Sequence, residues 1–236
     1  MELSEKTRAF EQKLAGLFSV QKPFSEHLLK WEDSVLPDKY DHNCFEYTAQ
    51  PTAAELACAL EYQKSRGAAF LKLEGNEPLE NALGLEPGVT LTMALLEKET
   101  HWKRNESLRF RTPALSELEE LEVKHFGPLY GEDFSRRNIR RLYGKLAFHG
   151  AYLENRLIAA CHSFSADDIT GIDGLIVDQA YRRRYAASSL LGHIKAEHPA
   201  DLLILHADNG DTPKEMYLKM GFQIVDRLYE YLRTDL

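Results

Sequence analysis

The sequence predicts an α/β protein built on a mixed, mainly antiparallel sheet flanked by helices. Two apolar runs, 147–153 and 157–164, enclose the polar turn 154–156, a pattern typical of an antiparallel hairpin. A third apolar run, 172–177, precedes a basic turn and a segment with helical spacing of its apolar residues. The run 202–206 is almost wholly apolar, as expected of a strand buried on both faces. Strands and helices therefore alternate along this half of the chain.

The remaining elements of the C-terminal half follow from apolar spacing and from residues that end helices. Strands are predicted at 108–111, 222–225 and 228–232, and helices at 115–121, 134–146, 186–198 and 213–220. Pro213 stands at the first position of the last helix and Gly221 at its end, the places where these residues favour helix boundaries.

The N-terminal half has a weaker pattern. Helices are predicted at 5–18 and 52–64, and strands at 44–49, 68–73 and 89–96. The last elements of the chain follow the order strand, short helix, Gly-Phe and strand. A similar order occurs earlier, with a strand, a short helix at 79–83, Gly84-Leu85 and a second strand, which predicts a degenerate repeat. The most charged connector is 97–106. We therefore expect two domains, 1–104 and 105–236.

Composition limits the class of protein. Of 236 residues, 44% are hydrophobic and 28% charged, which predicts a soluble globular protein with a sizeable core. No segment approaches the roughly 18 apolar residues of a membrane span, and the N-terminus lacks the order of a signal peptide. Cys44, Cys58 and Cys161 have no metal-like spacing. We expect a cytoplasmic protein with reduced thiols and neither membrane nor metal.

The net charge of −8 argues against duplex nucleic acid as the main partner. The same charge is compatible with a cationic amine as substrate. The sequence leaves open whether the chain forms a homodimer.

The turn Arg182-x-x-Tyr185-x-Ala187, between a strand and a helix, resembles the acetyl-CoA signature Gln/Arg-x-x-Gly-x-Gly/Ala of the GNAT acetyltransferase superfamily. Farther on, Tyr217 stands four residues before Gly221-Phe222, as in that family's second landmark. The resemblance covers about 108–232. It implies a GNAT domain at 105–236 and a second, degenerate GNAT-like domain before it.

The order strand, basic turn and helix start is suited to binding a pyrophosphate. The first amides of the helix, the positive end of its dipole and the guanidinium groups would all face the anion. The resemblance implies acetyl-CoA as cosubstrate, with pantetheine lying along the strand before the turn. The residues that this implies for binding are Leu175, Ile176, Val177, Arg182, Arg183, Arg184, Tyr185, Ala186, Ala187 and Asn209.

Each of these assignments has an alternative. The arginines could form a solvated basic patch, and Asn209 could be a turn former. Tyr185 stands where the family has glycine, which lets backbone approach a phosphate and tolerates positive φ. We expect the tyrosine to fit if its backbone is helical and its ring points away.

Two residues are candidates for catalysis. Tyr217 carries a phenol that is protonated at neutral pH and can donate to the thiolate leaving group; its alternative role is core packing. Asp173, on the strand that leads to the turn, is the candidate base for the attacking amine. Glu154, His162 and His206 compete with it.

The resulting hypothesis is an acetyl-CoA-dependent N-acetyltransferase that acts directly on a small-molecule amine or a peptide amine. The main alternative is a non-catalytic acyl-CoA-binding regulatory or interaction module, favoured by Tyr185 and by the undetermined base. A purely structural pairing domain is a third reading. The sequence does not identify the acceptor.

Overall fold

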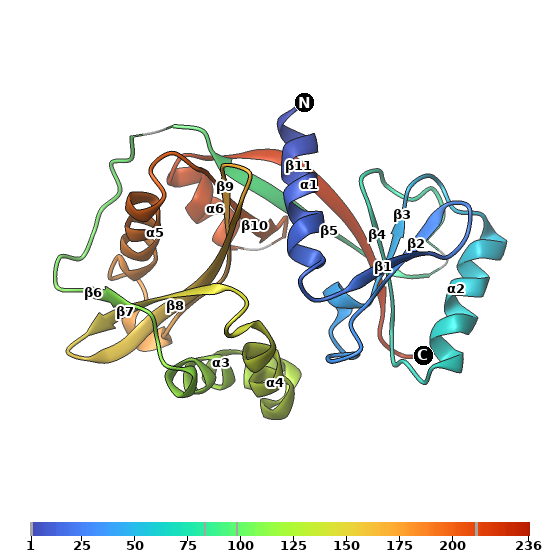
Figure 1. Ribbon diagram of the computed structural model, residues 1–236, viewed down its shortest axis with the longest axis horizontal. Helices are drawn as coiled ribbons and strands as arrows, with labels where there is room; N and C mark the ends of the chain where they lie inside the picture. The colour runs from blue at the N-terminus through green and yellow to red at the C-terminus, as the bar shows by residue number, and fades with distance from the viewer. Residues whose placement is uncertain (1, 83, 98, 211) are drawn as a thin grey trace. The chain divides into compact units, whose positions relative to one another are not determined.

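The computed structural model describes residues 2–82, 84–97, 99–210 and 212–236. The chain divides into two compact units (Figure 1). The first unit comprises Met1–Thr92, Ala207–Lys214 and Ile224–Leu236, and the second comprises Met93–His206 and Glu215–Gln223. Three strands and helix α6 (Thr212–Lys219) contribute residues to both; the strands are β5 (Glu86–Leu95), β10 (Leu202–Asp208) and β11 (Phe222–Arg233). A sequential boundary near residue 104 therefore stays a prediction.

The first unit is a sheet with the strand order β1-β2-β3-β4-β11. Neighbouring strands are antiparallel except β3 and β4, which are parallel. Its elements are α1 (Leu3–Ala15), β1 (Val20–Pro23), β2 (Leu28–Glu32), the 3-10 helix η1 (Tyr40–His42), β3 (Phe45–Tyr47), α2 (Ala53–Ser65) and β4 (Leu71–Gly75).

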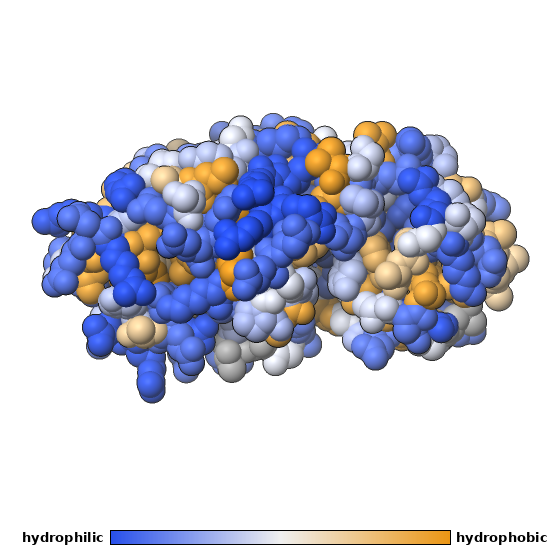
Figure 2. Space-filling view, turned by 90° about the horizontal axis from the view of Figure 1, so that it is seen from below, coloured by the Kyte–Doolittle hydropathy of each residue, from blue (hydrophilic) through white to orange (hydrophobic). Residues whose placement is uncertain are grey.

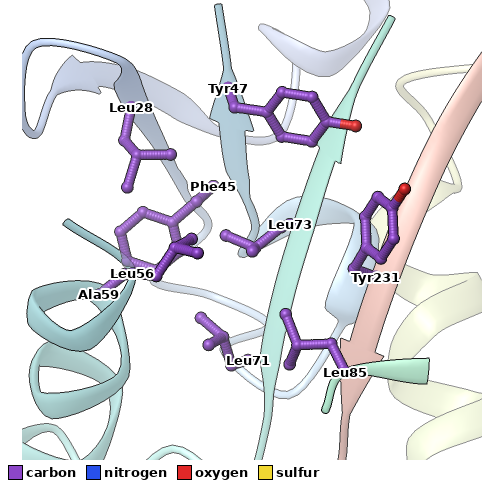
Figure 3. Packing of buried hydrophobic residues seen from close by; sticks show 9 residues of the cluster. All are labelled: Leu28, Phe45, Tyr47, Leu56, Ala59, Leu71, Leu73, Leu85 and Tyr231. Carbon is purple, nitrogen blue, oxygen red and sulfur yellow. The ribbon is translucent and has the colours of Figure 1, made fainter. Parts of the chain in front are cut away.

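Helix α2 begins at a capping box. Thr52 Oγ1 accepts from the Glu55 amide at 3.2 Å, and Glu55 Oε2 accepts from the Thr52 amide at 2.8 Å, so two amides of the first turn are satisfied. Leu56 and Ala59 on this helix are buried against the sheet. Figure 3 shows that β11 adds Tyr231 to the same core. The core residues drawn there are Leu28, Phe45, Tyr47, Leu56, Ala59, Leu71, Leu73, Leu85 and Tyr231.

The second unit contains a sheet with the strand order β10-β9-β8-β7-β6. These strands are antiparallel except for the parallel pair β9 and β10. Helices α3 and α4 cover one face and α5 the other (Figure 1). The elements are β6 (Arg109–Arg111), α3 (Leu115–Tyr130), α4 (Glu132–Leu142), β7 (Ala147–Leu153), β8 (Arg156–Ala166), β9 (Ile169–Val177), the 3-10 helix η2 (Gln179–Tyr181), α5 (Ala186–Glu197) and α6 (Thr212–Lys219).

The predicted fold class is confirmed, with local corrections. Strands β1 and β2 were not predicted. Residues 79–82 are not helical, and Leu83 lies outside the described residues. The predicted strands 222–225 and 228–232 are one strand, β11. Each unit contains a strand, a turn, a helix and a parallel strand: β3, α2 and β4 in the first, and β9, α5 and β10 in the second.

Hydrophilic residues dominate the face of the molecule in Figure 2, where hydrophobic residues form separate patches. None of the helices in the described ranges has the length and apolar character that a bilayer crossing requires.

Candidate active site

A bulge interrupts β9 in the middle of the second unit. The antiparallel register passes from Ala160 opposite Ile176 to His162 opposite Asp173, so β9 carries one extra residue there. Gly174 lies in this bulge with φ +62°. A Cβ on Gly174 would come 2.7 Å from His162 Cε1, closer than carbon atoms pack. Both the backbone conformation and the close approach therefore favour glycine at this position.

Strand β9 continues beyond its parallel partner. The register with β10 runs from Ile169 opposite Leu202 to Ile172 opposite Leu205, and β9 extends to Val177. Leu175, Ile176 and Val177 lie in this extension. On the β10 side, such an extension offers backbone groups to a ligand lying alongside in extended conformation. The structure thus confirms that these three residues lie in a strand before the basic turn, and their binding of pantetheine stays a prediction.

The basic turn follows directly. Asp178 Oδ1 accepts from the Ala180 amide at 3.1 Å and starts η2. Arg182, Arg183 and Arg184 are exposed, and Ala186 and Ala187 begin α5. The side chains of the three arginines are thus available to an anion at the N-terminal end of the helix.

Tyr185 departs from the sequence prediction. Its backbone is left-handed, with φ 62° and ψ 19°, rather than helical. This is a conformation that glycine adopts without steric cost, so the turn keeps the geometry of a glycine turn while carrying a tyrosine. The ring is 49% exposed, and Lys103 Nζ lies 5.9 Å from its centroid.

Tyr217 lies near Asp173 and Cys161 in the same unit. The Tyr217 side chain is buried and packs edge-on against Phe222, with 5.9 Å between ring centroids. Burial, reinforced by the negative charge of Asp173, raises the pKa of Tyr217 well above its ordinary value. The phenol is therefore protonated throughout the physiological range, so in a proton transfer it would act as the acid.

Asp173 has a histidine beside it. Its side chain is 65% exposed, and Asp173 Oδ2 lies 3.9 Å from Nε2 of the mostly buried His162. Asp173 Oδ1 accepts from the Gly174 amide at 2.7 Å. The candidate base Asp173 therefore lies at the bulge of β9.

The other predicted residues lie elsewhere. Glu154 is in the β7–β8 turn, eight residues and roughly 26 Å of extended strand from His162. His206 follows the paired part of β10. Asn209 is exposed and groups with the first unit; its backbone carbonyl and Oδ1 accept from Lys214 Nζ at 2.6 and 3.3 Å. A pocket of about 490 Å³ at the other end of α5, near His149 and Glu197, includes no predicted site residue in its lining.

Two residues that contribute to this region were not predicted from the sequence. Gly174 interrupts an apolar strand pattern, which is a recognisable signal of a bulge. Asn105 donates through Nδ2 to the Arg184 carbonyl at 3.2 Å. These residues are 79 positions apart, so no local pattern predicts the contact.

The fold is shared with several solved structures at low sequence identity. A functionally unknown conserved protein from Staphylococcus epidermidis has 18% identity and a TM-score of 0.81, with 92% of this chain and 95% of the other covered. A GCN5-related N-acetyltransferase from Kribbella flavida has 15% identity and a TM-score of 0.65, with 98% and 95% covered. A tandem GNAT protein from the clavulanic acid biosynthesis pathway has 12% identity and a TM-score of 0.54, with 87% and 78% covered.

No curated protein matches the sequence. The model of the acetyltransferase (GNAT) family matches residues 115–222, a range that contains the β9 bulge, the basic turn and Tyr217. Residues 115–222 of this protein therefore form a domain of the GNAT acetyltransferase family.

Proposed function

We propose that this protein transfers an acetyl group from acetyl-CoA directly to an amine. The observation that carries the proposal is the continuous path formed by the β9 extension, the exposed arginines of the turn and the start of α5. Backbone groups along β9 would bind pantetheine, and the arginines with the helix amides would bind the pyrophosphate. Leu175 to Val177 and Arg182 to Ala187 are the binding residues in this proposal.

The chemistry requires one bond to form and one to break. The neutral amine attacks the thioester carbonyl, a C–N bond forms, and the C–S bond breaks as the sulfur leaves. Tyr217 would donate its proton to the departing thiolate, and Asp173, with His162 beside it, would take a proton from the amine. Alignment of the amine with the thioester supplies much of the rate.

An assay of free thiol released from acetyl-CoA in the presence of a panel of amines tests the proposal. Acetyl-CoA should also raise the melting temperature, because a ligand that binds the native state stabilises it. The double variant Arg182→Ala, Arg184→Glu should weaken that shift. An unchanged shift would remove the arginines from the site.

A non-catalytic acyl-CoA-binding module is the second candidate, favoured by the tyrosine at position 185. It predicts the same melting shift without thiol release for any amine. A mass-shift screen of metabolites and peptides, incubated with protein and acetyl-CoA, separates small-molecule acceptors from peptide amines. We place the reaction in the cytoplasm, with neither metal nor nucleic acid required.

A further inference from the structure

The segment Trp102–Asn105, here named the strap, precedes β6 and is fastened to the start of α5. Ser189 Oγ accepts from the Asn105 amide at 2.8 Å, and Ser188 Oγ donates to the Lys103 carbonyl at 2.6 Å. Ser189 is buried, so its hydroxyl gains a defined partner inside the protein. Two successive residues of α5 thus hold two residues of the strap.

The strap also holds the basic turn itself. Asn105 Nδ2 donates to the carbonyl of Arg184, the residue immediately before the left-handed Tyr185. Asn105 Oδ1 meanwhile accepts from the Ser107 amide at 3.1 Å, which fixes the orientation of the amide group. The Arg184–Tyr185 peptide is therefore oriented from outside the turn.

The far end of the strap is anchored on the element that carries Tyr217. Trp102 Nε1 donates to the Met220 carbonyl at 2.7 Å, and the indole stacks on Phe222 with 6.0 Å between centroids. One short segment thus connects the basic turn with the end of α6. These contacts all lie within the second unit.

The strap brings charge to the turn. Lys103 is exposed and its ammonium lies over the Tyr185 ring, next to three exposed arginines. Arg182 Nε donates to the Val177 carbonyl at 3.4 Å and Arg184 lies over the Tyr181 ring, but all four cations remain exposed beside one helix start. An anionic ligand would relieve the repulsion among them.

We propose that the strap is a part of the phosphate-binding site, in which Lys103 contacts the phosphates of the acyl-CoA and Asn105 positions the turn that receives them. This inference rests on the proposed function, because it names further residues of the same cofactor site. A segment outside the two family landmarks thereby determines affinity for the nucleotide end of the cosubstrate.

The test compares two thioesters. S-Acetyl-pantetheine carries the same acetyl group and thiol but lacks the pyrophosphate and the nucleotide. Lys103→Ala should raise the KM for acetyl-CoA roughly threefold to fivefold, and Asn105→Ala should raise it about threefold to tenfold. Neither should change kcat/KM for S-acetyl-pantetheine, whereas a general loss of structure would lower the values for both thioesters.

Lys64→Ala is the matched control for removal of an exposed cation, since Lys64 lies on α2 and pairs with Glu61. Acetyl-CoA binding measured by calorimetry provides a second readout that needs no turnover. If the parent protein binds no acetyl-CoA, the proposed function fails. If the parent binds acetyl-CoA and both strap variants bind it as tightly as Lys64→Ala does, this inference is wrong. It is also wrong if the strap variants lower kcat/KM equally for acetyl-CoA and S-acetyl-pantetheine, because the strap is then structural.

Discussion

The imidazole of His162 lies directly against Gly174, where the space that a Cβ would need on Gly174 is already occupied by the ring. His162 comes from β8 and Gly174 from the bulge of β9, so the contact joins two neighbouring strands at the point where β9 leaves β10. The shape of the bulge and the place of the candidate base are therefore set by one contact.

Gly174→Ala should destabilise the protein for two reasons. The substitution puts a side chain at positive φ and forces it against His162, which together should lower the free energy of unfolding by about 1–3 kcal/mol. Urea denaturation measures the loss. Gly67→Ala is the matched control, because Gly67 has φ +68° but nothing within 4 Å of a Cβ. Equal losses for the two variants would show that His162 imposes no steric limit at the bulge.

Tyr185→Gly tests the left-handed turn. Glycine relieves about 1–2 kcal/mol of left-handed strain and adds a smaller entropy cost of about 0.5–1 kcal/mol through the unfolded chain, so stability should stay within about 1 kcal/mol of the parent. Acetyl-CoA affinity, measured by calorimetry, should be unchanged or higher. Tyr185→Ala keeps the strain and removes the ring, so it should be less stable than Tyr185→Gly. The reverse order would mean that the turn is not left-handed in solution.

The two units should differ in their capacity for acyl-CoA. In the first unit, the Tyr47 ring lies against Gly75 where β3 and β4 end their parallel pairing, and its hydroxyl donates to the Glu77 carbonyl at 2.6 Å. Figure 3 shows this ring inside the packed core. The following turn, 48–52, contains no arginine. Calorimetry should therefore give one acetyl-CoA per chain, and a stoichiometry of two would contradict this account.

The contrast between local and distant contacts explains what the sequence could predict. The turn at Arg182 and the Tyr217 landmark each occupy a few successive residues, so the sequence identified both. The pairing of β11 with β4 joins Arg233 to Leu71, and no local pattern specifies such a partner. Strand β2 was missed because the buried Lys30 breaks its apolar pattern; its ammonium donates to the Asn43 carbonyl at 2.9 Å. His162 and Asp173, two of the predicted candidate bases, lie 3.9 Å apart on the neighbouring strands β8 and β9, and their sequence positions alone do not show this contact.

Acid stability should depend on His42. Burial lowers the pKa of His42 to about 4 from an ordinary value of 6.5, although its Nδ1 lies 3.0 Å from Asp33 Oδ2. Between pH 6.5 and 4 the unfolded chain binds a proton that the folded chain does not, so stability falls as the pH falls through this window. His42→Gln, which keeps a donor for Asp33, removes this titration.

Urea titrations from pH 7 to 4 measure the effect. The free energy of unfolding of the parent should fall more steeply than that of His42→Gln, by at most about 1.4 kcal/mol per pH unit. Titrating groups far from His42 contribute equally to both proteins and cancel in the difference, whereas the neighbouring Asp33 and Asp41 are coupled to His42 and belong to the measured effect. If the free energies of unfolding of the two proteins change in parallel with pH, the pKa of His42 is not lowered in the folded state.

Tyr217→Phe separates catalysis from packing. The change keeps the ring against Phe222 and deletes the one group proposed to protonate the thiolate, so turnover with a verified acceptor should fall at least tens-fold, within the roughly hundredfold to ten-thousandfold range of general acid catalysis. Acetyl-CoA affinity and melting temperature should hardly move, since no large cavity forms. Because the pKa of Tyr217 is raised, the parent should show no loss of turnover from phenol ionisation as the pH rises to 9. Turnover within twofold of the parent would make Tyr217 a packing residue, and a collapse in stability would assign its hydroxyl to a structural network instead.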